Sequence, residues 1–164
     1  MRLSLYKAVA ALSFSSSAVA SPLENLTSYC NPSRPASGNE LRGIFYDYVE
    51  EFYFQRNFAG ATNKYVALNL IQHNPQIANG SAAQIAAVTS ILANYDGPNF
   101  ELALVDEERG YGIVFNQFIG KPGTGLPLSA VVDIWRFEGT CIVEHWDDIE
   151  ALPPNSTNPV PFKL

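Results

Sequence analysis

Apolar residues in the first half of the folded region recur every three or four positions, a spacing that predicts amphipathic helices. The longest helix is predicted to begin at the N-cap residue Asn39 and to end near Asn57. Its apolar stripe consists of Leu41, Ile44, Phe45, Tyr48, Val49, Phe52 and Tyr53. We expect a second short helix or turn after Gly60, an apolar segment over residues 65–72, and a third helix over residues 80–94.

The second half of this region changes to a pattern that is typical of strands. Residues 100–106, 112–118, 128–137 and 141–148 are rich in Val, Ile and aromatic residues and are separated by turn signals. Three helical segments followed by a four-stranded antiparallel meander predict an α+β domain, with the helices packed on one face of a curved sheet. We expect the other face to be concave and to form a small-molecule pocket.

The two ends of the chain differ from this folded region. Residues 1–20 combine Arg2 and Lys7, a short apolar run, and Ala18-Val19-Ala20, a pattern that predicts a secretory signal peptide and hence a secreted protein. The apolar run is shorter than the roughly 20 residues that span a bilayer, so we expect no membrane anchor. Residues 21–39 and 151–164 are rich in proline and predict an extended arm and a tail, which leaves one domain over residues 40–150.

Export would allow two kinds of covalent modification. The sequons at Asn25, Asn79 and Asn155 would be glycan acceptors in a secretory compartment. Cys30 and Cys141 are the two cysteines, and an oxidising compartment allows them to form one disulfide. The alternative is two buried free thiols.

Composition and charge narrow the classes of function. The chain of 164 residues has ten basic and sixteen acidic side chains and no basic cluster, which argues against a nucleic-acid partner. Hydrophobic residues make up 47% of the sequence, so a packed core is expected. Two cysteines and two histidines exclude a cysteine-rich zinc site and leave few candidates for catalysis.

Both histidines lie close in sequence to other polar candidates. His73 is in the segment Gln72-His73-Asn74-Pro75, and His145 lies between Glu144 and Asp147 on the last predicted strand. Asp133 lies among apolar residues on the preceding strand, where an unpaired buried carboxylate would be costly. A carboxylate beside a histidine is suited to general acid–base catalysis.

The register of the last hairpin decides which of these groups meet. A two-residue loop, Glu138-Gly139, would place Asp133 opposite Glu144, whereas a three-residue loop would place Asp133 opposite His145. We favour the longer loop, because it avoids a pair of acids. Asp147 would then share one face with Asp133 and His145.

The motifs 72–75, 133–137 (Asp-Ile-Trp-Arg-Phe) and 142–147 (Ile-Val-Glu-His-Trp-Asp) resemble the SnoaL-like polyketide cyclase family of the nuclear transport factor 2-like (NTF2-like) superfamily. The resemblance covers residues 40–150 and implies a cone of curved antiparallel sheet closed by three helices. It also implies an intramolecular aldol condensation without cofactor or metal. Asp147 matches the position of the family's general base, Asp133 that of a supporting polar group, and His73 and His145 match pocket-lining positions.

The resemblance leads to a functional hypothesis with two rivals. In the hypothesis, Asp147 removes a proton beside a carbonyl while a protonated His145 or His73 stabilises the enolate, in a cyclisation, isomerisation or dehydration of a small carbonyl or polyketide-like substrate. The first rival is a non-catalytic carrier of a small hydrophobic ligand. The second is a metal enzyme that uses His73, His145 and one carboxylate. Homodimers are common in the superfamily, so a second copy of the chain is a further candidate partner.

Overall fold

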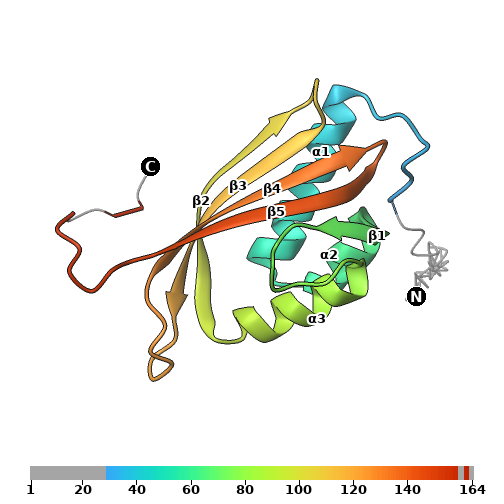
Figure 1. Cartoon of the computed structure of the whole chain (residues 1–164). Coiled ribbons are helices and arrows are strands. Elements are labelled where there is room, and N and C mark those ends of the chain that lie inside the picture. The colour runs from blue at the N-terminus through green and yellow to red at the C-terminus, as the bar shows by residue number, and fades with distance from the viewer. Residues whose placement is uncertain (1–28, 159–160, 163–164) are drawn as a thin grey trace, which may run out of the picture.

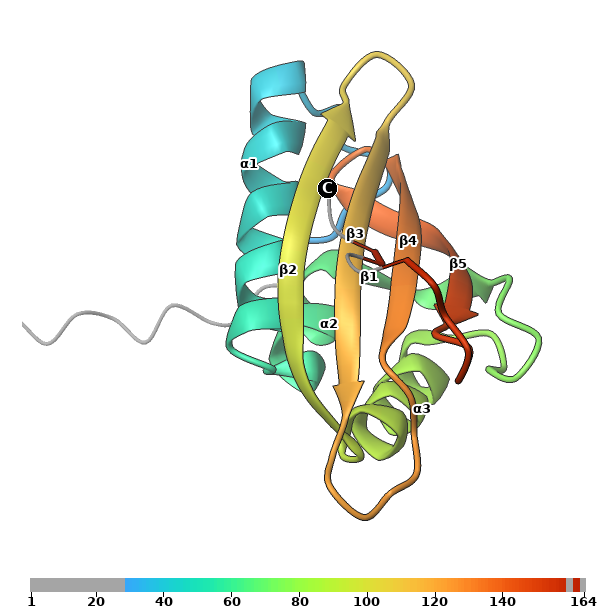
Figure 2. The same ribbon diagram turned by 90° about the vertical axis from the view of Figure 1, so that its left-hand side faces the viewer.

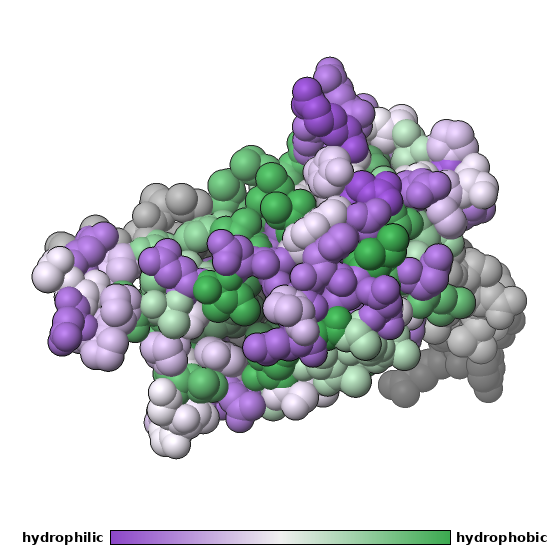
Figure 3. All heavy atoms as spheres, viewed as in Figure 1, coloured by the Kyte–Doolittle hydropathy of each residue, from purple (hydrophilic) through white to green (hydrophobic). Residues whose placement is uncertain are grey.

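The structure is a computed structural model that describes residues 29–158, 161 and 162 (Figure 1). The predicted signal peptide over residues 1–20 and the sequon at Asn25 lie outside these residues and stay predictions. Within the described part of the chain, no helix is both long enough and apolar enough to cross a membrane. Apolar residues are interspersed with polar ones on the face shown in Figure 3.

The helices follow the predicted order. They are α1 (Gly38–Val49), the π-helical η1 (Glu50–Phe54), α2 (Phe58–Tyr65) and α3 (Ser81–Leu92). The first helix is capped by Ser37, whose side chain accepts a hydrogen bond from the backbone of Glu40, and so it begins earlier than the predicted cap at Asn39. Asn57 caps α2 in the same way, through the backbone N–H of Gly60. The long predicted helix is therefore α1 continued by one π-helical segment.

The sheet contains one more strand than the meander predicted from the sequence. Its strands are β1 (Val66–Gln72), β2 (Tyr95–Asp106), β3 (Tyr111–Gly120), β4 (Ser129–Glu138) and β5 (Cys141–Ala151), in the spatial order β1-β5-β4-β3-β2. The meander from β2 to β5 is antiparallel, as predicted. The apolar segment at residues 65–72 supplies β1, which pairs in parallel with β5 and makes the sheet mixed.

The core lies between the helices and the inner face of the sheet (Figure 2). Tyr48 packs against Trp135 and Phe52, with each pair of ring centroids 5.1 Å apart. Helix α1 approaches β3 closely at Gly112, where a Cβ atom would lie 2.3 Å from the ring of Phe45. A side chain at Gly112 would therefore require the ring of Phe45 to move.

The register of the last hairpin differs from both predicted alternatives. The turn is Gly139-Thr140, and a β-bulge follows it, because Phe137 pairs with Ile142 while the preceding residue, Arg136, pairs with Glu144. The extra residue, Val143, shifts every later pair by one position. Asp133 consequently lies opposite Asp147 rather than opposite Glu144 or His145.

The structure nevertheless retains one feature of the favoured register, the grouping of the candidate residues on one face of the sheet. Trp135 lies opposite His145, so Asp133, Trp135, His145 and Asp147 still share the inner face of the sheet. Arg136 and Glu144 share the outer face, where they form an ion pair. The bulge produces the grouping that the longer loop was predicted to produce.

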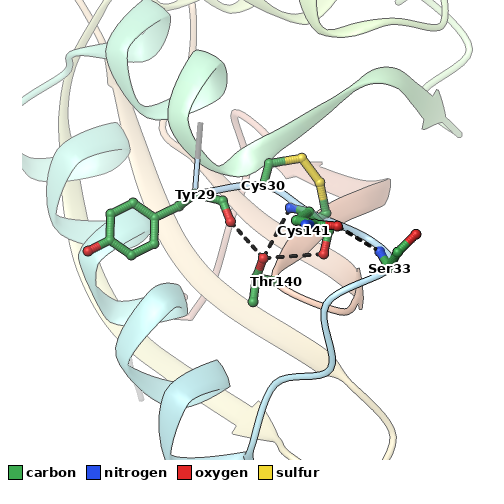
Figure 4. The surroundings of a disulfide bond; sticks show 6 residues. Tyr29, Cys30, Ser33, Thr140 and Cys141 are labelled. Carbon is green, nitrogen blue, oxygen red and sulfur yellow. Dashed lines mark hydrogen bonds between the residues drawn. A yellow bond between two sulfur atoms is a disulfide. The ribbon is translucent and has the colours of Figure 1, made fainter. Parts of the chain in front are cut away.

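Of the two alternatives for the cysteines, the structure has the disulfide. Cys30 and Cys141 are bonded across 111 positions of sequence (Figure 4). Next to the bond, Thr140 Oγ1 donates to the backbone oxygen of Tyr29 at 2.6 Å and accepts from the backbone N–H of Asn31 at 3.0 Å. The N-terminal arm is thereby fixed over the tip of the β4–β5 hairpin.

Candidate functional site

A cavity of about 220 Å³ lies between the inner face of β3–β5 and the segments η1 and α3. We expected the pocket on the face of the sheet that the helices leave open, and this is wrong: the helices form part of its wall. Most of the wall is apolar and includes Ile77, Val88, Ile91, Leu92, Phe118 and Val131. The polar end is formed by Asp133, His145 and Asp147.

Asp133 and His145 are in direct contact at this end. His145 Nε2 lies 3.1 Å from Asp133 Oδ1, and both side chains are buried. The second carboxylate oxygen, Oδ2, accepts hydrogen bonds from Tyr53 Oη at 2.9 Å and from Asn116 Nδ2 at 3.2 Å. Three donors therefore surround Asp133, which provides the compensation that a buried carboxylate needs.

The direction of the Tyr53 hydrogen bond is fixed by its other neighbour. Trp135 Nε1, which can only donate, lies 3.1 Å from Tyr53 Oη. The phenolic proton of Tyr53 therefore points to Asp133. Burial raises the pKa of Tyr53 well above its usual value, and the negative charge of Asp133 raises it further, so the phenol remains a donor.

The protonation of His145 follows from Gln72, which lies beside it on β1. The backbone N–H of Asn74 donates to Gln72 Oε1 at 3.2 Å, and Gln72 Nε2 donates to Gln84 Oε1 at 2.5 Å. Gln72 Oε1 is therefore an acceptor. Because it lies 2.8 Å from His145 Nδ1, Nδ1 carries a hydrogen.

His145 Nε2 faces a carboxylate oxygen and must donate as well. An imidazole with hydrogens on both nitrogen atoms is a cation, so the hydrogen-bond pattern describes an imidazolium paired with Asp133.

Asp147 completes the polar end from the position opposite Asp133. Its side chain is half-buried, and both carboxylate oxygens accept from Asn74 Nδ2, at 2.9 and 2.7 Å. Asn74 is itself held in this orientation, because its Oδ1 accepts from the backbone N–H of Gln76. Two carboxylates and one imidazolium give this end of the cavity a net charge of about −1.

The same three residues are the candidates for a bound cation. Asp133, His145 and Asp147 each offer one ligand atom, and these atoms lie within 4.8 Å of one another. The hydrogen bond between His145 and Asp133 already uses one ligand atom of each residue. A metal ion would have to break that bond, so the donor set is better suited to holding protons than to holding a metal ion.

His73 is not part of this group. It follows the inward-facing Gln72 and lies on the outer side of the sheet, where its ring stacks on Trp146 at a centroid distance of 4.3 Å. Its Nε2 is 3.3 Å from Glu144 Oε2, and its side chain is 40% exposed. The sequence-based expectation that His73 lines the pocket is therefore not met, and the proposed pair of histidine ligands, His73 and His145, is not assembled.

The sequence did not point to several residues that build the site. The apolar spacing accounts for Tyr53 only as part of a helix stripe, and the candidates from the sequence do not include Gln84, which is 1% exposed on α3. A glutamine inside a mostly apolar helix was the available signal, since a buried amide requires partners.

The remaining modification sites have clear positions. Asn79 and Asn155 are both exposed. Asn79 also accepts a hydrogen bond from the backbone of Gln72 at 2.9 Å through Oδ1. Glycosylation at Asn25, Asn79 and Asn155 stays a prediction.

The chain has the α+β cone fold of NTF2-like and SnoaL-like proteins, as predicted. No protein-family model matches it, and no curated protein matches it in sequence. Its fold is similar to that of a steroid Δ-isomerase from Pseudomonas aeruginosa, with a TM-score of 0.58 and 12% identity over 73% of this chain and 85% of the other.

Two further solved structures support this assignment of the fold. A candidate SnoaL-like polyketide cyclase from Mesorhizobium loti has a TM-score of 0.54 and 19% identity over 66% of this chain and 97% of its own. An NTF-2-like protein of unknown function from Burkholderia xenovorans has a TM-score of 0.55 and 11% identity over 71% and 88% of the two chains. Identities at this level establish the fold and leave the activity to be argued from the site.

Proposed function

We propose that this protein binds a small carbonyl compound in the cavity and catalyses an acid–base reaction on it, of the aldol, isomerisation or dehydration type. The observation that carries the proposal is the position of Asp147. Its carboxylate lies at the polar end of an otherwise apolar cavity and is held by Asn74. Such a group is placed to remove a proton from a carbon atom next to the carbonyl of a bound substrate.

The neighbouring pair supplies the electrostatic part of this mechanism. When Asp147 takes the proton, its negative charge is neutralised and the electron pair of the C–H bond forms the enolate. The charge of the His145 ring, whose ligand atom lies within 4.8 Å of that of Asp147, stabilises the enolate through space, because both ring N–H groups are already hydrogen-bonded. Asp133 and Gln72 hold the His145 ring in this orientation through hydrogen bonds to its two nitrogen atoms.

His73 has no part in this mechanism, because it lies on the outer side of the sheet. The structural neighbours are consistent with the reaction class, since they include proteins named as polyketide cyclases and as a steroid isomerase. Secretion would place the reaction outside the cell, and the disulfide agrees with an oxidising compartment.

The test is exchange of α-protons for deuterium in a panel of β-keto esters and cyclic ketones, followed by NMR. The wild-type protein should accelerate exchange of at least one compound, and Asp147→Asn should reduce that acceleration by about 10²- to 10⁴-fold. The matched control is Asp148→Asn, which removes the same charge from the adjacent, exposed outer position.

Two results would decide against catalysis. Equal exchange rates for the wild type and Asp147→Asn would remove Asp147 from the mechanism. Binding of the ketones without any accelerated exchange would instead support the carrier function, because a carrier needs the cavity and not the base.

A further inference from the structure

The donors next to Asp133 and Asp147 are used within the protein. Tyr53 donates to Asp133, and Trp135 donates to Tyr53. Asn74 Nδ2 donates to Asp147. A ligand group placed beside Asp147 therefore meets carboxylate oxygens, which accept hydrogen bonds, although the amides of Gln76 and Gln84 also line the cavity.

The one cationic side chain at this end is similarly occupied. His145 directs Nδ1 to Gln72 and Nε2 to Asp133, so neither N–H is available to an anion. Among the described residues that line the cavity there is no lysine and no arginine. An acidic ligand would find no free charged donor to replace the water that it loses on binding.

The charge of the site acts in the same direction. Asp133 is neutralised by His145, whereas Asp147 is paired with a neutral amide and keeps its negative charge. A carboxylate or phosphate on the ligand would therefore lie beside a like charge in a partly buried site. A hydroxyl group would instead find an acceptor.

From these contacts we infer that the cavity takes an uncharged, largely apolar molecule with a hydroxyl group that faces Asp147, and that it discriminates against carboxylates and phosphates. This inference rests on the site of the proposed function but not on turnover. It is compatible with an enolate intermediate, because the enolate forms only as Asp147 takes up a proton and loses its charge.

The experiment compares aromatic and alicyclic alcohols with the carboxylic acids of the same carbon skeletons at neutral pH. Binding is followed by the indole N–H signals of the two tryptophans in protein NMR spectra. Trp135 lines the cavity and Trp146 lies on the outer side of the sheet, so the chain contains its own control. Alcohols should shift the Trp135 signal and leave that of Trp146 in place, and their affinities should exceed those of the matched acids at least tenfold.

The variants test whether Asp147 is the cause of the discrimination. Asp147→Asn should raise the affinity for the acids about tenfold, and Asp148→Asn should leave it unchanged. Acids that bind as tightly as alcohols, or a panel in which no alcohol shifts the Trp135 signal, would overturn the inference. Failure of α-proton exchange would leave the binding preference intact, so the two proposals can fail separately.

Discussion

The two faces of the β4–β5 hairpin carry similar residues in very different surroundings. On the inner face, His145 is 3% exposed and contacts the buried Asp133. On the outer face, His73 is 40% exposed and lies beside Glu144, which also pairs with Arg136. The inner groups depend on hydrogen bonds from five different elements, whereas the outer groups remain in contact with water.

This difference shows that the surroundings of a histidine–carboxylate pair decide what the pair can do. Desolvation makes every unsatisfied group on the inner face costly, so protons are held at defined atoms. Water on the outer face weakens the same interactions and lets the side chains reorganise. The inner pair can therefore hold a fixed charge, whereas the outer pair contributes little to stability.

The largest expected difference between the faces concerns the loss of one carboxylate. Asp133→Leu leaves His145, Tyr53 and Asn116 without their acceptor and should lower the free energy of unfolding by about 3–5 kcal/mol. Glu144→Leu on the outer face should cost less than about 1 kcal/mol. Urea denaturation of both variants measures the contrast, and similar losses would show that the inner network is not as tightly coupled as its geometry indicates.

Asp133→Asn sharpens the same comparison. An asparagine can accept from Tyr53 and donate to His145, which then needs a hydrogen only on Nδ1. This variant should therefore lose much less stability than Asp133→Leu. The ¹⁵N chemical shifts of the His145 ring should change from the values of an imidazolium cation to those of a neutral imidazole. An unchanged cation would contradict the proton assignment.

A smaller effect is expected at Gln72. Gln72→Leu removes the acceptor of His145 Nδ1 and the donor to Gln84, and buried groups left in this state cost about 1–3 kcal/mol. Gln72→Glu keeps an acceptor for His145 and should restore the Nδ1–H signal in NMR spectra. If the leucine variant keeps that signal unchanged, Gln72 does not position His145.

The smallest effect is expected on the outer face and depends on pH. Arg136 chiefly, and His73 to a lesser extent, lower the pKa of Glu144 below its usual value. A lowered carboxylate pKa stabilises the folded state above the unfolded value of about 4.3, and this contribution disappears as the pH falls through the lower folded pKa. The free energy of unfolding of the wild type should thus exceed that of Glu144→Gln by less than about 1 kcal/mol at neutral pH. This difference should vanish in acid.

Denaturation midpoints of the two proteins between neutral pH and strong acid measure this difference. A gap that grows on acidification would mean that the sign of the Glu144 contribution is wrong.

Much of the fold could be predicted because most helices and strands have a recognisable local pattern of apolar residues. The three-and-four spacing located α1 and α3, and the Val- and Ile-rich runs located β2 to β5. The π-helical continuation after Val49 has the same apolar spacing as an α-helix, so the sequence did not distinguish them. The parallel pairing of β1 with β5 depends on contacts between distant segments, which a local pattern does not contain.

The site was predicted in part for the same reason. Asp133, His145 and Asp147 were expected on one face, and they lie there. His73 was expected with them, but Gln72 takes the inward position on β1 and directs its neighbour outward. Tyr53 and Gln84 join the site from helices, and their roles appear only once those helices are packed on the sheet.

The β-bulge at Val143 makes the site depend on the number of residues in the hairpin as well as on their identity. In an unbroken ladder after the same turn, His145 would pair with Ile134 and Asp147 with Val132, and both would face outward. A hairpin in which Val143 entered the ladder would therefore turn the site inside out while leaving every site residue in the sequence, whereas deletion of Val143 would leave the present pairs in place.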